Sequence, residues 1–239
     1  MSLETTTTAN TNLPEPNPAE VAMLEEMSKA GILYGRKKNK TNPKMRPFIL
    51  ATRSGVEIFD LPQTLEAAAK AQEFIRQIKD KKGKILFVST QPATKDLIKA
   101  LAEKMDSPFV IERWLGGTFT NFEIISKRTR YYTKLKTDRA GGRLEKYTKK
   151  ERIQFDKEIA RMDKLFSGIE KMEKLPDALF VVDSALKNHL TAVTEANQMN
   201  IPVIAIVNSD NNPVVIKYPV PGNTSARSSV SWLLDKIFA

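Results

Sequence analysis

The stretch DALFVVDSALKNHLTAVTEANQMNIPVIAIV, residues 177–207, alternates between two patterns. Residues 178–182 and 203–207 are short continuous apolar runs, which are typical of strands buried on both faces of a sheet. The residues between them carry apolar side chains at helical spacing. Two buried strands joined by a helix predict a parallel pair with a crossover connection.

The same alternation appears on both sides of this stretch. KILFVST and PFVIE read as strands with the helix PATKDLIKALAEKM between them, and SARSSVSWLLDKIF reads as a closing helix. The chain is therefore predicted to form an α/β domain, with a doubly wound parallel sheet covered on both faces. Upstream, PAEVAMLEEMSKAG and LPQTLEAAAKAQEFIRQIKDKKG indicate helices, and FILAT with VEIFD indicates a hairpin.

Three segments are predicted to lack regular structure. Residues 1–17 are polar, rich in Thr and Asn and broken by proline, so they are expected to form a disordered tail. Residues 32–47 contain YGRKKNKTNPKMRP, which has no apolar period and is expected to be an extended basic loop. YPVPGN, near the end of the chain, is expected to be a rigid turn.

More than sixty residues separate PFVIE from DALFVVD, where one helix would suffice. The second half of this interval has apolar residues spaced 4, 3, 4 and 3, which is a heptad seam: Phe155, Ile159, Met162, Phe166 and Ile169. A weaker seam precedes it: Phe122, Ile125, Tyr132 and Leu135. With Gly141 and Gly142 as the tip, residues 122–173 are predicted to be an inserted antiparallel coiled-coil hairpin. Residues 18–121 and 174–239 would form the two parts of the α/β domain.

RWLGGTFTNF, residues 113–122, would be the joint of this hairpin. Thr120 and Glu123 match a capping box, with Phe119 and Ile124 as a hydrophobic staple. Gly116 and Gly117 would supply the turn from strand to helix. A phosphate-binding role at the helix start is the alternative reading.

The net charge is +10, and the positive charge is concentrated in two zones. Residues 27–56 hold eight Lys and Arg and no acidic residue, and residues 127–152 hold eleven against three acidic residues. Solvated surfaces usually mix both signs. The pattern therefore favours binding of a polyanion such as nucleic acid.

Several function classes are disfavoured. The absence of cysteine excludes disulfides, iron–sulfur clusters and thiolate zinc sites, and the single histidine, His189, is expected to be structural. The strand KILFV is followed by STQPATK, which lacks the glycines of nucleotide-binding loops. Asp60 and Asp183 end strands, which suits helix capping as well as catalysis. We expect no enzyme, cofactor, small-molecule substrate or membrane span.

Several strings, taken in order, resemble the bacterial ribosomal protein S2 family. They are NPKMRPFILATRSGVEIFDLPQT, KILFVSTQPATK, RWLGGTFTNF, KYTKKE, LPDALFVVDSALKNH, EANQMNIPVIAIVNSDNNP and YPVPGN. The resemblance covers about residues 27–228 and implies a flavodoxin-like domain with an inserted coiled coil. It further implies a cytoplasmic, non-catalytic subunit that binds ribosomal RNA at the head–body junction of the small subunit. Neighbouring ribosomal proteins, including a large one made of OB domains, would dock on it.

Candidate RNA-binding residues follow from charge and from this resemblance. They are Arg36, Lys37, Lys38, Lys40, Lys44, Arg46, Arg53, Arg113, Trp114, Lys127, Arg128, Arg130, Lys134, Arg139, Arg143, Lys146, Lys149, Lys150 and Arg227. Arg113 and Trp114 either contact RNA or pack the base of the hairpin, and Tyr132 either stacks on RNA or belongs to the seam. Leu33 and Arg36 stand where the family has histidines. The alternative function is an RNA-modifying enzyme that uses the hairpin to reach RNA.

Overall fold

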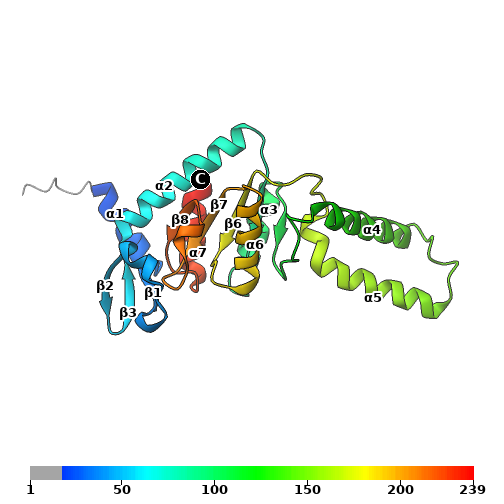
Figure 1. Ribbon diagram of the computed structural model, residues 1–239, viewed down its shortest axis with the longest axis horizontal. Helices are drawn as coiled ribbons and strands as arrows, with labels where there is room; N and C mark the ends of the chain where they lie inside the picture. The colour runs from blue at the N-terminus through cyan, green and yellow to red at the C-terminus, as the bar shows by residue number, and fades with distance from the viewer. Residues whose placement is uncertain (1–17) are drawn as a thin grey trace, which may run out of the picture.

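The computed structural model describes residues 18–239 and contains a five-stranded parallel sheet (Figure 1). Its strands are β4 (Ile85–Val88), β5 (Phe109–Val110), β6 (Ala178–Val182), β7 (Val203–Val207) and β8 (Tyr218–Pro221). Their spatial order is β5-β4-β6-β7-β8, which in chain order is the 2-1-3-4-5 arrangement of flavodoxin-like sheets. The predicted parallel α/β sheet is confirmed. The tail predicted for residues 1–17 lies outside the described residues.

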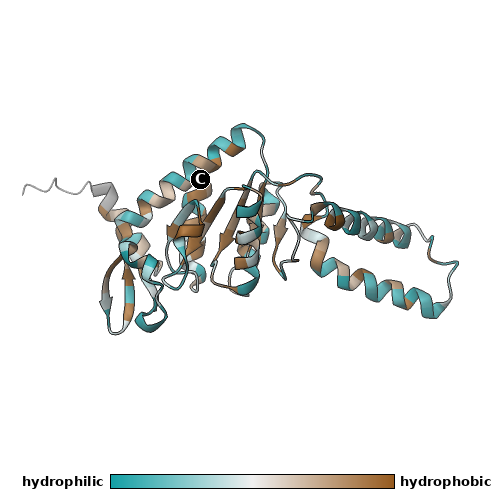
Figure 2. Ribbon diagram, in the orientation of Figure 1, coloured by the Kyte–Doolittle hydropathy of each residue, from teal (hydrophilic) through white to brown (hydrophobic). Residues whose placement is uncertain are grey.

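Helices cover both faces of this sheet. α2 (Leu61–Asp80), α3 (Lys95–Lys104) and α7 (Arg227–Phe238) pack on one face, and α6 (Lys187–Gln198) packs on the other. Along β6, Phe180 faces the first set of helices, whereas Leu179 and Val181 face α6, because side chains alternate along a strand. Figure 2 shows the apolar colouring of these buried strands. α1 (Pro18–Lys29) precedes the sheet and contributes Met27 to the first cluster.

A second, three-stranded sheet lies at one end of the molecule (Figure 1). It has the order β1-β3-β2, with β1 (Tyr34–Lys37), β2 (Ile49–Arg53) and β3 (Val56–Phe59) pairing antiparallel. The turn between β2 and β3 consists of Ser54 and Gly55, both with positive φ, as a two-residue hairpin requires. The predicted hairpin is therefore confirmed.

Two segments have more structure than the sequence predicted. Residues 34–48 are not an extended loop, since they form β1 and the 3-10 helices η1 (Lys38–Lys40) and η2 (Pro43–Phe48). The Asn42 side chain caps η2 by accepting from the Lys44 N–H, and Met45 is fully buried. YPVPGN is not only a turn, because residues 218–221 form β8. β8 pairs with β7 alone, and an edge strand tolerates prolines.

α4 (Phe122–Ala140) and α5 (Lys149–Phe166) extend away from the sheet at the opposite end (Figure 1). α4 leads outward and α5 returns, and we call this pair with its connecting turn the arm. Apolar side chains are buried between the two helices near the sheet, with the Tyr132 and Phe166 rings 6.3 Å apart. Further out, Arg139 pairs with Asp156 across the helices at 2.6 Å.

The expected capping box at Thr120 and Glu123 is wrong. α4 begins at Phe122, no side chain caps its N-terminus, and Ile124 is exposed, so no staple forms either. A capping box occurs instead at α5. The Thr148 N–H donates to Glu151, and the Glu151 N–H donates to the Thr148 hydroxyl.

Candidate nucleic-acid interface

The basic residues of the first zone lie on structured backbone beside the small sheet. We call Lys37, Lys38, Lys40, Lys44, Arg46 and Arg53 the loop surface. All six side chains are exposed, and none forms an ion pair within the described part of the chain. The Asn42 N–H donates to the Ser209 carbonyl oxygen at 2.8 Å, which holds this segment against the loop after β7.

Arg36 differs from its neighbours because its side chain turns inward. One guanidinium nitrogen lies 3.3 Å from Asp183, and Nε lies 3.5 Å from Asp210. The Arg36 N–H also donates to the Ser209 hydroxyl at 2.8 Å. Arg36 therefore belongs to an internal network, and its guanidinium is not free to bind phosphate in this conformation.

Asp183 is the centre of that network, at the carboxyl end of β6. It is buried and adopts a positive φ of 65°. Its carboxylate accepts hydrogen bonds from five groups: Arg36 Nη2, Gln91 Nε2, Ala185 N, Asn211 Nδ2 and Thr224 Oγ1. Neighbouring Asp210 is partly buried, and this burial raises its pKa, as does the charge of Asp183, while Arg36 opposes the shift.

His189 completes the same region. It is fully buried, its Nε2 accepts from the Thr90 N–H at 3.0 Å, and its Nδ1 donates to the Asp183 carbonyl oxygen at 2.7 Å. Burial lowers the pKa of His189, which favours the neutral ring. In flavodoxin-like sheets ligands bind where the strand order reverses, here between the ends of β4 and β6. Hydrogen bonds cross that point: Gln91 donates to the Asp183 carboxylate, and the His189 ring bonds to the Thr90 N–H and the Asp183 carbonyl oxygen. His189 therefore has a structural role, as the sequence predicted.

The joint RWLGGTFTNF holds an internal carboxylate rather than a phosphate. Glu195 of α6 is buried and accepts from Trp114 Nε1, the Gly117 N–H and the Phe119 N–H, at 2.9 to 3.0 Å. Gly117 has a φ of +87°, a conformation that glycine tolerates, and its N–H donates to Glu195. Trp114 is 3% exposed, so its assignment to RNA is corrected: it packs the base of the arm. Arg113 beside it is exposed.

The arm carries the second zone, mostly on its outer faces. We call Lys127, Arg128, Arg130, Lys134, Arg139, Arg143, Lys146, Lys149 and Lys150 the arm surface. All nine are exposed, and three of them pair with carboxylates: Lys127 with Glu123, Arg139 with Asp156 and Arg143 with Asp138. Tyr131 is exposed, whereas Tyr132 is buried in the seam and donates to Asp163. Burial, followed by this bond, raises the pKa of Tyr132.

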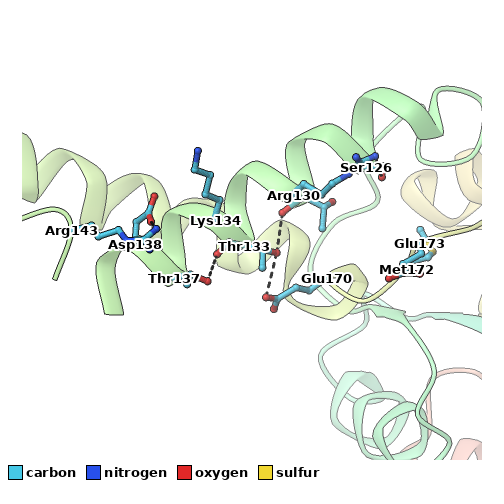
Figure 3. Close-up of a pocket in the computed structure, with 11 residues that line it drawn as sticks. Ser126, Arg130, Thr133, Lys134, Thr137, Asp138, Arg143, Glu170, Met172 and Glu173 are labelled. Carbon is cyan, nitrogen blue, oxygen red and sulfur yellow. Dashed lines mark hydrogen bonds and ion pairs between the residues drawn. The ribbon is translucent and has the colours of Figure 1, made fainter. Parts of the chain in front are cut away.

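A groove of about 650 Å³ runs along one face of α4 (Figure 3). Thr129, Thr133 and Thr137 lie one turn apart in it, and each hydroxyl donates to the carbonyl oxygen four residues earlier. Arg130 and Lys134 stand along its rim, and Glu170 accepts from Thr133 on the other side. Three cations and three carboxylates line this groove, so it is less positively charged than the outer faces of the arm.

Comparison with known proteins decides the family. The model of the family described as ribosomal protein S2 matches residues 27–239. The chain belongs to the ribosomal protein S2 family. It is 39% identical over 214 residues to small ribosomal subunit protein uS2 of Roseiflexus castenholzii, covering 90% of this chain and 81% of that one. It is 36% identical over 219 residues to the protein of the same name from Thermus thermophilus, covering 92% and 84%.

Membership of the S2 family makes the chain a structural ribosomal protein of the small subunit, in the cytoplasm, and not an enzyme. None of the helices described between residues 18 and 239 is long and apolar enough to cross a membrane. Sequence reasoning missed the role of Glu195 as a buried acceptor. For Asp183 it offered helix capping or catalysis, whereas the structure makes this residue the centre of a buried hydrogen-bond network and not the N-cap of α6.

Proposed function

We propose that this S2 protein binds small-subunit ribosomal RNA through the loop surface and the arm surface. The observation that carries the proposal is the concentration of exposed cations on two structured segments. None of the loop-surface cations and only three of the nine arm-surface cations form an ion pair in the described part of the chain. Such cations bind phosphates and position a protein on RNA without reading its sequence. The arm, read as a coiled-coil hairpin, would place its cations far from the α/β core. Arg113 and Arg227, both exposed, would add contacts between the two surfaces.

The finer placement rests on the resemblance to the family. We propose that the protein lies at the head–body junction of the small subunit and supports docking of neighbouring ribosomal proteins, among them a large one built of OB domains. Arg36 is the residue of the first zone that we assign a different role, because it pairs with Asp183 and Asp210.

Neutralising the loop surface tests the proposal. Replacing Lys37, Lys38 and Lys40 by Gln should weaken binding to small-subunit ribosomal RNA and flatten the plot of log affinity against log salt by about 2 to 3 units, at roughly 0.7 to 0.9 per contact. The thermal midpoint should stay near the wild-type value, because these side chains are exposed. Filter binding at several salt concentrations measures the slope.

The matched control replaces three exposed lysines outside both surfaces, Lys70, Lys99 and Lys104, by Gln. It removes the same charge and should leave the slope unchanged. Equal slopes for the wild type and the loop variant would contradict the proposal for this surface.

A further inference from the structure

A pocket of about 390 Å³ lies between the loop surface and the hairpin of the small sheet. Its volume is within the roughly 300–1,000 Å³ that small-ligand sites occupy. Two cations, two hydroxyls, a carboxylate and a proline ring are among the groups that line it. These residues are Lys38, Thr41, Pro43, Arg46, Thr52 and Glu57. We call it the Glu57 pocket.

Glu57 is an unusual residue for its position. Along β3 it shares a face with Phe59, which is in the core, and it is only 5% exposed. Within the described part of the chain it forms no ion pair, although Lys38 and Arg46 line the same pocket. A buried carboxylate without a cation is costly unless hydrogen-bond donors satisfy it. Glu57 is therefore an acceptor that a ligand with N–H groups would satisfy further.

The remaining acceptor capacity of Glu57 can be counted. Thr41 donates to Oε1 at 3.3 Å and Thr52 donates to Oε2 at 2.7 Å. A carboxylate has about four lone-pair sites, so about one remains on each oxygen. Two neighbouring oxygens, each with one free site, match a ligand that presents two N–H donors side by side.

Guanine is the nucleobase with that edge. Its N1–H and N2 amino group are adjacent donors, whereas adenine and cytosine each place a ring nitrogen acceptor beside their amino group, and uracil has one N–H between two carbonyls. Unpaired RNA bases expose this edge, and proteins read it by hydrogen bonds. Resting on the RNA-binding function proposed above, we propose that the Glu57 pocket binds one unpaired guanine base of RNA, with Lys38 and Arg46 on the adjoining phosphates.

The test uses the full chain and labelled pentanucleotides UUXUU, in which X is guanine, adenine, cytosine or hypoxanthine. Fluorescence anisotropy should show the guanine oligonucleotide binding about tenfold tighter than the adenine and cytosine ones. Hypoxanthine, which lacks the 2-amino group, should fall between them. Equal affinities for all four would overturn the proposal while leaving the general RNA-binding function intact, and loss of all binding would overturn both.

Two variants localise the preference. Glu57→Gln presents one acceptor and one donor, so the preference for guanine should fall to within about twofold, while Glu66→Gln, an exposed carboxylate on α2, should keep it. A guanine preference that survives in Glu57→Gln would mean that Glu57 only holds Thr41 and Thr52. Competition by micromolar GMP would show a site for free nucleotides and would also overturn the proposal. If Glu57→Gln does not fold, the comparison of guanine with hypoxanthine on the wild type still decides.

Discussion

Buried carboxylates connect the parts of this protein at the level of single residues. Glu195 of α6 accepts three N–H donors from the joint of the arm, and Asp183 accepts donors from four different segments. Each therefore joins backbone that lies far apart in the chain. A carboxylate satisfied by several donors is stable when buried, whereas removal of one partner leaves unsatisfied groups that cost about 1–3 kcal/mol each.

Asp210 lies beside Asp183 without enough donors to offset its burial, since one of its oxygens has no partner in the described structure. Burial raises its pKa above the value expected in the unfolded chain. The folded state thus binds the proton of the Asp210 carboxyl group more tightly than the unfolded chain does. The stability contributed by this protonation is present at low pH and is lost as pH rises through the raised pKa.

Asp210→Asn removes the free-energy cost of burying a charged carboxylate at this position. We expect a higher thermal midpoint than the wild type at pH 7, and a difference that shrinks toward zero as the pH is lowered below the ordinary range of an aspartate. Thermal melts at a series of pH values measure the difference. Asp235→Asn, an exposed position on α7, controls for the change in net charge. A lower midpoint at pH 7 would show that the ion pair with Arg36 outweighs burial.

The two ends of the arm differ in how much apolar surface they bury. At its base, Ile125, Phe166 and Ile169 belong to the same apolar cluster as Val110 of the sheet, and a side chain at Gly168 would overlap the Phe109 carbonyl oxygen. At its outer end the residues are mostly hydrophilic (Figure 2), and apolar packing there is limited to a few side chains such as buried Leu144 and the Tyr147–Phe155 ring pair. Lys149 and Lys150 occupy the first turn of α5, where the helix dipole disfavours cations, so they do not serve helix stability.

Deletions of different length should separate these two ends. Replacing residues 134–161 by a short Gly/Ser linker should leave cooperative melting intact, because adjacent helices are only about 8–10 Å apart and a few residues bridge them. Replacing residues 122–173 should abolish it. This larger deletion removes five side chains of the core cluster, at roughly 2–5 kcal/mol each, from a total stability of about 5–15 kcal/mol. They are Ile125, Tyr132, Met162, Phe166 and Ile169. Calorimetry of both proteins tests the expectation. Cooperative melting of both deletion proteins would show that the whole arm lies outside the core.

At the scale of the whole molecule, the two basic surfaces lie at opposite ends, with the parallel sheet between them (Figure 1). A protein with two separated phosphate-binding surfaces can bridge two segments of one folded RNA. Once the first surface is bound, the second binds at a high effective concentration. This arrangement suits a structural ribosomal protein, and the internal network at Asp183 occupies the place where a related sheet would bind a nucleotide.

Combining variants at both ends tests bridging. Lys146, Lys149 and Lys150→Gln should reduce the salt slope by about 2 to 3 units, as should the loop variant, and the combined protein by about 4 to 5. The fold should persist, since all six side chains are exposed. Binding to small-subunit ribosomal RNA across a salt series gives all four slopes. A combined slope equal to that of one triple variant would mean that only one surface contacts the RNA.

Elements whose patterns are local could be predicted from the sequence. The apolar runs of β4, β6 and β7 and the helical spacing of α2, α5 and α6 follow from periodicity, because burial of one face dictates which positions are apolar. The two charged zones were equally readable, since charge does not depend on the fold. The structured backbone of residues 34–48 was not, because β1 pairs with the more distant strand β3 and η2 depends on one capping side chain.

Whether a polar side chain is exposed or internal depends on the tertiary structure. Arg36 and Lys37 are neighbours in one basic run, yet one pairs with Asp183 and the other is exposed. Trp114 and Glu195 are 81 residues apart and meet in one hydrogen bond. A glutamate in a strand is usually exposed, but the fold buries Glu57 beside two threonines. Such pairings depend on the position of distant segments, which no local pattern encodes.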